Sequence, residues 1–325
     1  MKKSLIALAV LAAAGAASAQ SSVTLYGRVD AGLVSVKDQI SGDGVTRTKL
    51  DSNVLNNSLW GIKGTEDLGN GLKANFVLEQ GMSIDDGAPA AAERAFHRKA
   101  TVGLSGDFGA VELGRNYTAY DSLRGATNNT ADTNMAVTGD VWKVGGDYAV
   151  RVNNSVRFDS NVYSGFSGSA SYAFGENKAT GKDSTDNLAL HVKYANGPLL
   201  VGYAHQTEMA ATGADTKFNL FAGSYDFGVA KLNAGYNKAS RAGDNKDTEF
   251  QVGVSAPFGA TTVYFGYANA KNDDAGDVTK RNGFDLAATY ALSKRTTAYA
   301  GYKTFKIKDA DEKASAVGVG VRHVF

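Results

Sequence analysis

The last nine residues of the chain alternate strictly between two faces. One face carries Val317, Val319, Val321, His323 and Phe325, and the other carries Gly318, Gly320, Arg322 and Val324. A period of two is that of a β-strand. A largely apolar face opposite a mixed one, with a terminal aromatic residue, fits a membrane β-barrel, in which each strand meets lipid on one side and water on the other. The same pattern recurs along the chain, so this strand constrains the whole fold.

The N-terminus has the three parts of a secretory signal peptide. Lys2 and Lys3 form the charged region, residues 5–14 the apolar region, and Ala17-Ser18-Ala19 the small-residue cleavage site. The apolar run is too short for a transmembrane anchor. We expect cleavage after Ala19, which gives a signal peptide of residues 1–19 and a mature domain of residues 20–325.

Composition narrows the class of protein. Loss of the two N-terminal lysines leaves 32 basic and 33 acidic residues, so the net charge of the mature chain is about −1. Nucleic-acid-binding proteins, in contrast, usually carry an excess of basic residues. Cys is absent, so disulfides contribute nothing. The 3 Pro, 38 Gly, 15 Tyr and 15 Phe residues fit long hydrogen-bonded ladders, tight turns and aromatic girdles at the membrane interfaces.

Short and long connections alternate without exception. Short turns, most of them with Gly, are expected at 67–71, 105–109, 164–166, 196–198, 226–228, 257–259 and 292–295. Long polar connections are expected at about 37–57, 81–97, 118–153, 175–186, 206–216, 238–248, 269–281 and 305–315. These fifteen connections imply sixteen strands, an even number that lets the first strand pair with the last. We therefore predict an all-β fold, a 16-stranded antiparallel transmembrane β-barrel with short periplasmic turns and long extracellular loops.

The placement of charges tests this register. In the first strand, Val23 and Leu25 would face lipid while Arg28 and Asp30 face the lumen. Arg98 and Arg115 are exceptions, because strict alternation puts both on an apolar face; a bulge, a subunit interface or an early strand end would resolve either one. A soluble β-sandwich is the alternative fold, but it would rarely show such regular long and short connections.

A barrel of this size encloses an aqueous channel. The longest connection, residues 118–153, is expected to fold inward and set the narrowest section. The acids on this connection are Asp121, Asp132, Asp140 and Asp147, and the basic residues expected at mid-height on the wall are Arg28, Arg98, Lys99 and Arg157. Acids facing bases would create a transverse field that selects among ions, unless each charge is locally paired. Further lumenal lysines make the wall basic, which predicts a modest anion preference that the loop acids could cancel.

Catalytic and metal sites have little support. The four histidines (His97, His191, His205 and His323) lie on separate segments, outside any recognised catalytic or zinc-binding motif. We expect no enzyme activity, no cofactor and no metal in the site. The acids at 273–274 and 309–312 could bind Ca²⁺ or Mg²⁺ at the surface, but a solvated loop is the simpler interpretation.

Several strings resemble a known family. They are VTLYG at 23–27, WGIKGTEDLG at 60–69, VGLSG at 102–106 followed by Phe108-Gly109 and Leu113-Gly114-Arg115, NSVRF at 154–158, and VRHVF at 321–325. Together they resemble the general-diffusion porins of beta-proteobacterial outer membranes, over essentially all of residues 20–325. The WGIKGTEDLG string is the most specific of them.

The resemblance implies a homotrimer of 16-stranded barrels, each with its own pore. It implies that the third long loop forms the constriction and that mid-height arginines form a basic cluster. Arg157 matches one position of that cluster and Arg98 a second, whereas the third usual position, before Trp60-Gly61, is Leu59 here. Residues 81–97 match a loop that reaches into a neighbouring pore. The expected surroundings are the outer membrane of a Gram-negative bacterium, reached through the periplasm, with its lipid and lipopolysaccharide.

The expected function is passive diffusion of ions and small hydrophilic solutes. We expect no nucleic-acid partner. Within transport, the alternative is a substrate-specific channel with a solute site between loop and wall, which saturable block would indicate. Outside transport, the alternatives are an adhesive or structural barrel, whose pore would not conduct, and, more remotely, an outer-membrane hydrolase.

Overall fold

The structure, a computed structural model, describes residues 22–128, 133–143, 145–308, 310 and 312–325. The strands are β1 (Ser22–Asp38), β2 (Arg47–Ser52), β3 (Leu59–Gly69), β4 (Leu72–Gly81), β5 (Lys99–Gly106), β6 (Gly109–Tyr117), β7 (Arg151–Asp159), β8 (Phe166–Ala173), β9 (Asn187–Asn196), β10 (Leu199–Glu208), β11 (Thr216–Asp226), β12 (Lys231–Ser240), β13 (Lys246–Phe258), β14 (Thr261–Asp274), β15 (Asp277–Ala291), β16 (Thr296–Ile307) and β17 (Lys313–Val324). The helices are α2 (Ala119–Thr127), α3 (Thr138–Val141) and the 3-10 turn η2 (Ala242–Asp244). No described helix is long and apolar enough to cross a membrane.

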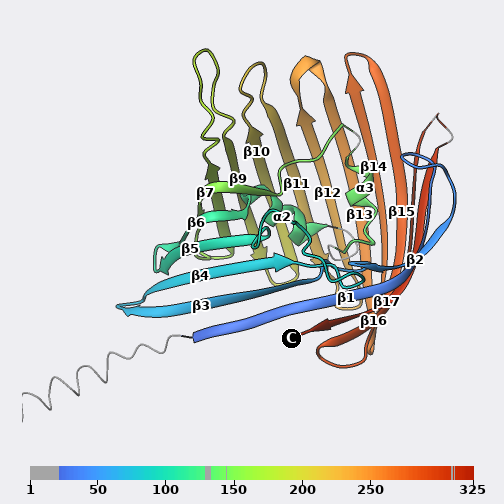
Figure 1. The fold of residues 1–325 in the computed structure, drawn as a ribbon, viewed down its shortest axis with the longest axis horizontal. Helices are drawn as coiled ribbons and strands as arrows, with labels where there is room; N and C mark the ends of the chain where they lie inside the picture. Colours follow the sequence, from blue (N-terminus) through green and yellow to red (C-terminus); the bar gives the residue numbers. More distant parts are fainter. Residues whose placement is uncertain (1–21, 129–132, 144, 309, 311) are drawn as a thin grey trace, which may run out of the picture.

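The strands form one closed antiparallel sheet (Figure 1). β1 pairs with β17 along one edge and with β3 and then β2 along the other. At the seam, Gly27 and Phe325 exchange two backbone hydrogen bonds of 3.0 Å. β2 and β3 together fill one position in the barrel, so the strand segments make the closed 16-stranded antiparallel barrel that the sequence predicts. The predicted fold class is confirmed.

The second position of the barrel is broken between β2 and β3, where residues 53–58 fold inward. The Asp30 carboxylate on β1 holds this break, because it accepts backbone N–H bonds from Leu55 at 3.1 Å and Asn56 at 3.2 Å. The Tyr299 hydroxyl donates to the same carboxylate at 2.9 Å. The predicted long loop at 37–57 therefore returns to the sheet as β2 and then turns into the lumen.

Several connections predicted as long loops are extended hairpins instead. The clearest is 269–281, where β14 and β15 continue to a turn of only Ala275 and Gly276. Both turn residues have positive φ, 51° and 98°, which is the conformation that two-residue hairpin turns require. The polar composition of this segment reflects strands that rise beyond the membrane, where both faces meet water.

The structure treats the two charges that violate strict alternation differently. β5 begins at Lys99, so Arg98 precedes the strand and turns inward to Glu79, 2.7 Å away. Arg115 sits at a register shift between Gly114 and Asn116. An early strand end therefore resolves Arg98, whereas Arg115 still pairs with outward-facing Ala100 of β5 and stays on the outer face.

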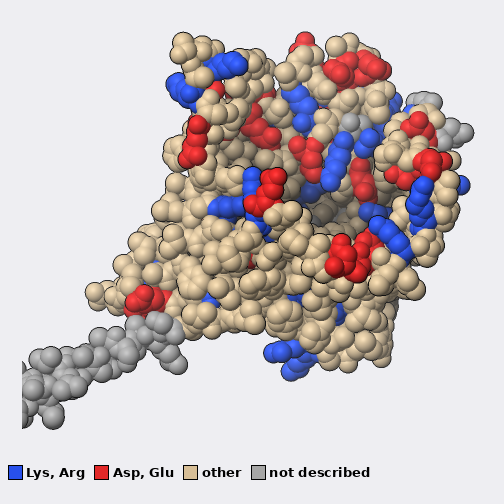
Figure 2. All heavy atoms as spheres, in the orientation of Figure 1, with Lys and Arg blue, Asp and Glu red and all other residues tan. Residues whose placement is uncertain are grey.

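The lipid and lumen faces follow the predicted alternation. Val23 and Leu25 on β1 are 68% and 61% exposed, whereas Asp30 on the lumenal face is fully buried. On β15, Leu286 points outward between Phe284 and Tyr290 and is 51% exposed. Figure 2 shows charged side chains gathered over the hairpin ends and around a hollow, with a wall below that carries few of them.

We predict that Leu286→Lys destabilises the folded barrel by about 2–4 kcal/mol, because it places a charge on the lipid face near mid-membrane. Thr289→Lys on the same strand is the matched control, since Thr289 lines a lumenal cavity and the lysine there stays in water. Urea unfolding in lipid vesicles measures both variants. Equal losses of stability at the two positions would contradict the assigned faces.

Candidate functional site: the pore constriction

The connection between β6 and β7 folds into the barrel, and α2 and α3 lie inside the ring of strands (Figure 1). Its apolar side chains, Leu123 and Val137 among them, are fully buried. They pack on small residues of the opposite wall, including Ala189, Ala204 and Ala268. The close approach needs a residue without a side chain at Gly202, where a Cβ would lie 2.7 Å from Leu123 Cδ1.

Hydrogen bonds fix the loop to the wall along its length. The wall partners lie on three strands, β12, β13 and β15. Tyr120 OH donates to Asn237 at 2.9 Å, and Gln251 donates to the Thr127 carbonyl at 2.9 Å. The Val137 amide donates to Asp285 at 2.9 Å, and Trp142 Nε1 donates to the Phe250 carbonyl at 3.2 Å. The loop is therefore part of the packed interior of the barrel.

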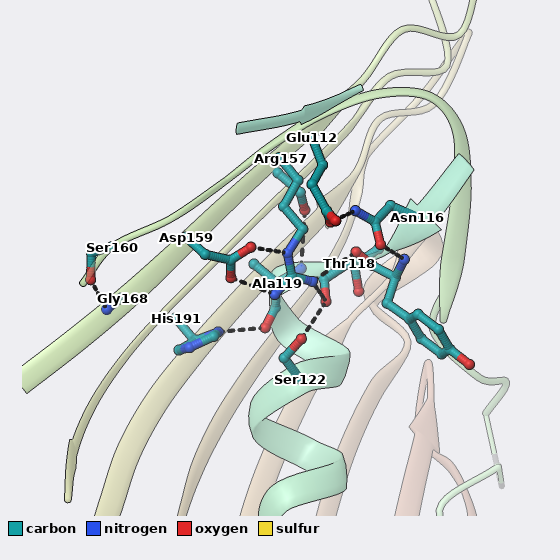
Figure 3. Close-up of polar contacts among 12 residues, drawn as sticks. Glu112, Asn116, Thr118, Ala119, Ser122, Arg157, Asp159, Ser160, Gly168 and His191 are labelled. Atoms are coloured by element: carbon teal, nitrogen blue, oxygen red, sulfur yellow. Dashed lines mark hydrogen bonds and ion pairs between the residues drawn. The ribbon is translucent and has the colours of Figure 1, made fainter. Parts of the chain in front are cut away.

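Arg157 clamps the root of the loop (Figure 3). Its Nε and Nη2 donate to the Asp159 carboxylate at 2.8 and 2.7 Å, and its Nη1 donates to the carbonyls of Tyr117 and Thr118 at 3.0 and 3.2 Å. His191 Nδ1 lies 2.7 Å from the next carbonyl, that of Ala119, so this nitrogen carries the proton. Two wall residues thus hold three successive carbonyls where α2 begins.

Opposite the packed face of the loop lies a polar cavity of about 610 Å³. Six basic and three acidic side chains of the described residues line it: Arg28, Arg98, Arg124, Lys143, Arg151 and Lys303, with Asp121, Asp140 and Asp147. The acids all belong to the loop, whereas Arg28, Arg98 and Arg151 come from the wall and strand ends facing it. Arg28 also lines two other lumenal cavities, so the three cavities adjoin one another at this residue.

Ion pairs neutralise only part of this charge. Lys303 bonds to Asp140 at 2.7 Å and Lys143 to Asp147 at 3.4 Å. Among the described residues, Arg28 and Arg151 make no ion pair. Arg28 donates to the Asn57 carbonyl at 2.7 Å, and Arg151 donates to Tyr117 OH at 2.6 Å while lying over the same ring. Neither guanidinium group is therefore neutralised by a carboxylate of the described residues.

An aromatic pair holds the loop arginine. Arg124 lies 5.1 Å from the centre of the Tyr148 ring and 5.5 Å from that of Trp142. Burial raises the pKa of the Tyr148 phenol well above its ordinary value, so the group stays protonated. Its hydroxyl donates to Asp121 at 2.6 Å. This loop acid is therefore held by hydrogen bonding at the cavity.

The residues predicted from sequence separate into two groups. Arg28 and Arg98 line the cavity together with Asp121, Asp140 and Asp147. Lys99 and Arg157 lie outside its lining: Lys99 pairs with Glu112 at 2.8 Å and Arg157 with Asp159. Asp132 and the expected cleavage site after Ala19 lie outside the described residues.

The sequence pattern does not single out two cavity residues, Arg151 and Lys303. Arg151 begins β7, at the end of the long connection, where no periodicity indicates its direction. The lumenal position of Lys303 could have been predicted, because it follows Tyr302 on β16 and adjacent strand residues face opposite sides of the sheet.

Family comparison agrees with this architecture. Residues 5–310 match the family model described as Gram-negative porin. The chain belongs to this porin family. Family and fold both indicate a channel rather than an enzyme, and they place this porin in the outer membrane as a passive route for ions and small hydrophilic solutes.

Individual relatives cover the whole porin. Outer membrane porin protein 32 of Delftia acidovorans is 37% identical over 361 aligned positions that cover both chains completely. Major outer membrane protein P.IB of Neisseria meningitidis serogroup B is 31% identical, again with complete coverage of both. The solved anion-selective porin from Comamonas acidovorans is 32% identical with a TM-score of 0.84, covering 94% of this chain and 100% of that one.

We predict that Arg157→Met loosens the loop root, because it leaves Asp159 and two carbonyls without their donor. The loss of stability should be about 2–3 kcal/mol, and single-channel current noise should increase. Lys99→Met is the matched control, since it removes a wall cation that does not contact the loop. If the two variants show the same noise, the clamp does not fix the constriction.

Proposed function

We propose that this porin is a passive, water-filled channel with a modest preference for anions. The observation that carries the proposal is the cavity beside the inward-folded loop, with six basic against three acidic side chains among its described lining residues. Two of the basic groups, Arg28 and Arg151, are without an ion pair among the described residues. An anion passing the constriction meets a net positive wall, whereas a cation meets acids that the loop has largely engaged.

The magnitude of the preference follows from the water in the pore. Two unit charges 4 Å apart interact by about 1 kcal/mol in bulk water, and salt screens that interaction over about 10 Å at 0.1 M. A few unpaired arginines therefore bias ion passage without excluding cations, and the bias should weaken as salt concentration rises. Similarity over nearly the whole chain to a porin described as anion-selective supports the same sign.

We also propose that the porin assembles as a homotrimer, as the family resemblance implies. β5 to β8 have only 8 or 9 residues, at or below the 9–11 that a membrane strand needs. Arg115 lies at the same register as outward-facing Ala100 on this short wall and bonds to the His97 carbonyl and to Asn153. A neighbouring subunit would cover both the short wall and this charge.

We predict that wild-type protein in a planar bilayer under a KCl gradient gives a reversal potential of the sign for Cl⁻ preference, in three equal conductance steps. Arg28→Glu with Arg151→Glu changes the described cavity charges from six basic and three acidic to four and five, so the preference should turn to cations.

Lys294→Glu is the control, because Lys294 lies exposed in the short turn after β15 and is not among the described residues that line the cavity. A reversal potential that the double variant leaves unchanged, or that Lys294→Glu shifts as much, would contradict the proposed origin of selectivity. Single steps in place of triplets would contradict the trimer.

A further inference from the structure

The outer surface of the barrel carries a second large cavity, unrelated to the pore. It is a groove of about 1070 Å³ at the extracellular ends of β14–β17. Apolar and basic side chains line it together, among them Tyr267, Phe284, Lys306, Lys308 and Lys313. Phe284 is 42% exposed on the lipid face, so the groove opens toward the membrane.

Lysines face one another across the strands of this groove. In the ladder, Lys271 is opposite Lys280 and Lys306 is opposite Lys313. The backbone N–H of Lys308 bonds to the Lys280 carbonyl, which puts a fifth lysine beside the first pair. Like charges directly opposite each other destabilise a sheet. Two such pairs side by side concentrate positive charge on this surface.

Register places these side chains on the outer face. Lys280 lies four residues from Phe284 on β15, and Lys271 lies four residues from Tyr267 on β14. Because strand side chains alternate with a period of two, each lysine shares the face of its aromatic residue. Lys306 is opposite Asn282, which shares this face too.

Acids offset little of the positive charge. Asp273 pairs with Lys271 at 3.1 Å, and Glu312 lines the groove. Among the described residues, Lys280, Lys306, Lys308 and Lys313 make no ion pair. The groove is therefore net basic over the part of the chain that the structure describes.

The height of the groove matches the polar edge of the outer leaflet. Phe284 and Tyr302 pack with ring centres 6.0 Å apart and lie on the lipid face, as in the aromatic girdle of a barrel. The lysines begin two to four residues beyond Phe284, roughly 7–13 Å along the strand at about 3.3 Å per residue. This is the level at which headgroup phosphates lie above acyl chains.

We propose that this groove binds lipopolysaccharide of the outer leaflet, with its phosphate groups on Lys280, Lys306 and Lys313 and its apolar part against Phe284 and Tyr267. Lysine is a common phosphate-binding side chain, and clusters of basic residues next to a membrane attract anionic lipid. The ligand supplies the negative charge that the opposed lysine pairs lack and covers aromatic side chains at the membrane interface.

The test compares binding of fluorescently labelled lipopolysaccharide to purified protein in detergent. The triple variant Lys280→Ser, Lys306→Ser, Lys313→Ser should bind at least about tenfold more weakly than wild type, since each lysine near an anionic lipid surface contributes of the order of 1 kcal/mol. Lipopolysaccharide stripped of its phosphates should bind wild type as weakly as the intact form binds the variant.

The matched control changes three exposed lysines on other extracellular hairpins, Lys178→Ser, Lys182→Ser and Lys217→Ser, and should keep affinity within about twofold. Equal binding of intact and phosphate-free lipopolysaccharide, or equal loss in both triple variants, would overturn the proposal. Saturable binding of inorganic phosphate with the affinity of lipopolysaccharide would also overturn it, because the aromatic floor would then play no part. Unchanged single-channel conductance in the groove variant verifies folding, so this outcome is separate from that of the pore.

Discussion

The rest of the structure depends on one constraint, that backbone groups in the hydrocarbon layer must find their partners within the protein. A sheet meets this constraint only if it has no edge, and β1 meets β17 to remove the edge. Closure brings Gly27 against the terminal Phe325, whose backbone completes the seam. The alternation of apolar and polar residues follows, because one side of a closed ladder must match lipid and the other can be wet.

Closure also creates a problem that the third long connection solves. Sixteen strands enclose a lumen too wide for wall side chains to fill. The loop enters this space, packs Leu123 and Val137 on wall alanines, and is held at its root by Arg157 and His191. The part of the lumen left open is therefore asymmetric, with the acids of the loop on one side and unpaired arginines on the other. That asymmetry gives the pore its charge, and the water in the pore keeps the resulting selectivity modest.

The outward-facing residues of the wall also change where the strands leave the membrane. Where the strands leave the hydrocarbon, their lipid-facing residues change from Phe284 and Leu286 to Lys280 and Lys306. The hairpins continue as paired strands instead of ending in loops, so the lysines are held in register. This basic surface, held in register above aromatic side chains, differs from the solvated charges at the hairpin tips. The long polar segments are extended hairpins instead of loops because their strands stay paired above the membrane.

Local patterns predict much of this structure. The strand count, the faces of β1 and the inward position of the longest connection all follow from a period of two and from turn spacing. The role of Arg157 does not, although Asp159 two residues later shares its face and could have indicated their pairing. The break at residues 53–58 depends on Asp30 and Tyr299, which are far apart in sequence. Long-range partners of single polar groups decide such features, and no local pattern contains them.

The central claim is that the inward loop lies in the path of the ions, and labelling one loop residue tests it directly. The chain has no Cys, so Gly139→Cys introduces a unique thiol at the cavity, in a place where an added side chain meets open space. Reaction with a bulky charged thiosulfonate during bilayer recording should reduce the current in three steps, whereas the same reagent on Leu286→Cys should leave it unchanged. A Gly139→Cys current that the reagent does not alter would contradict the account.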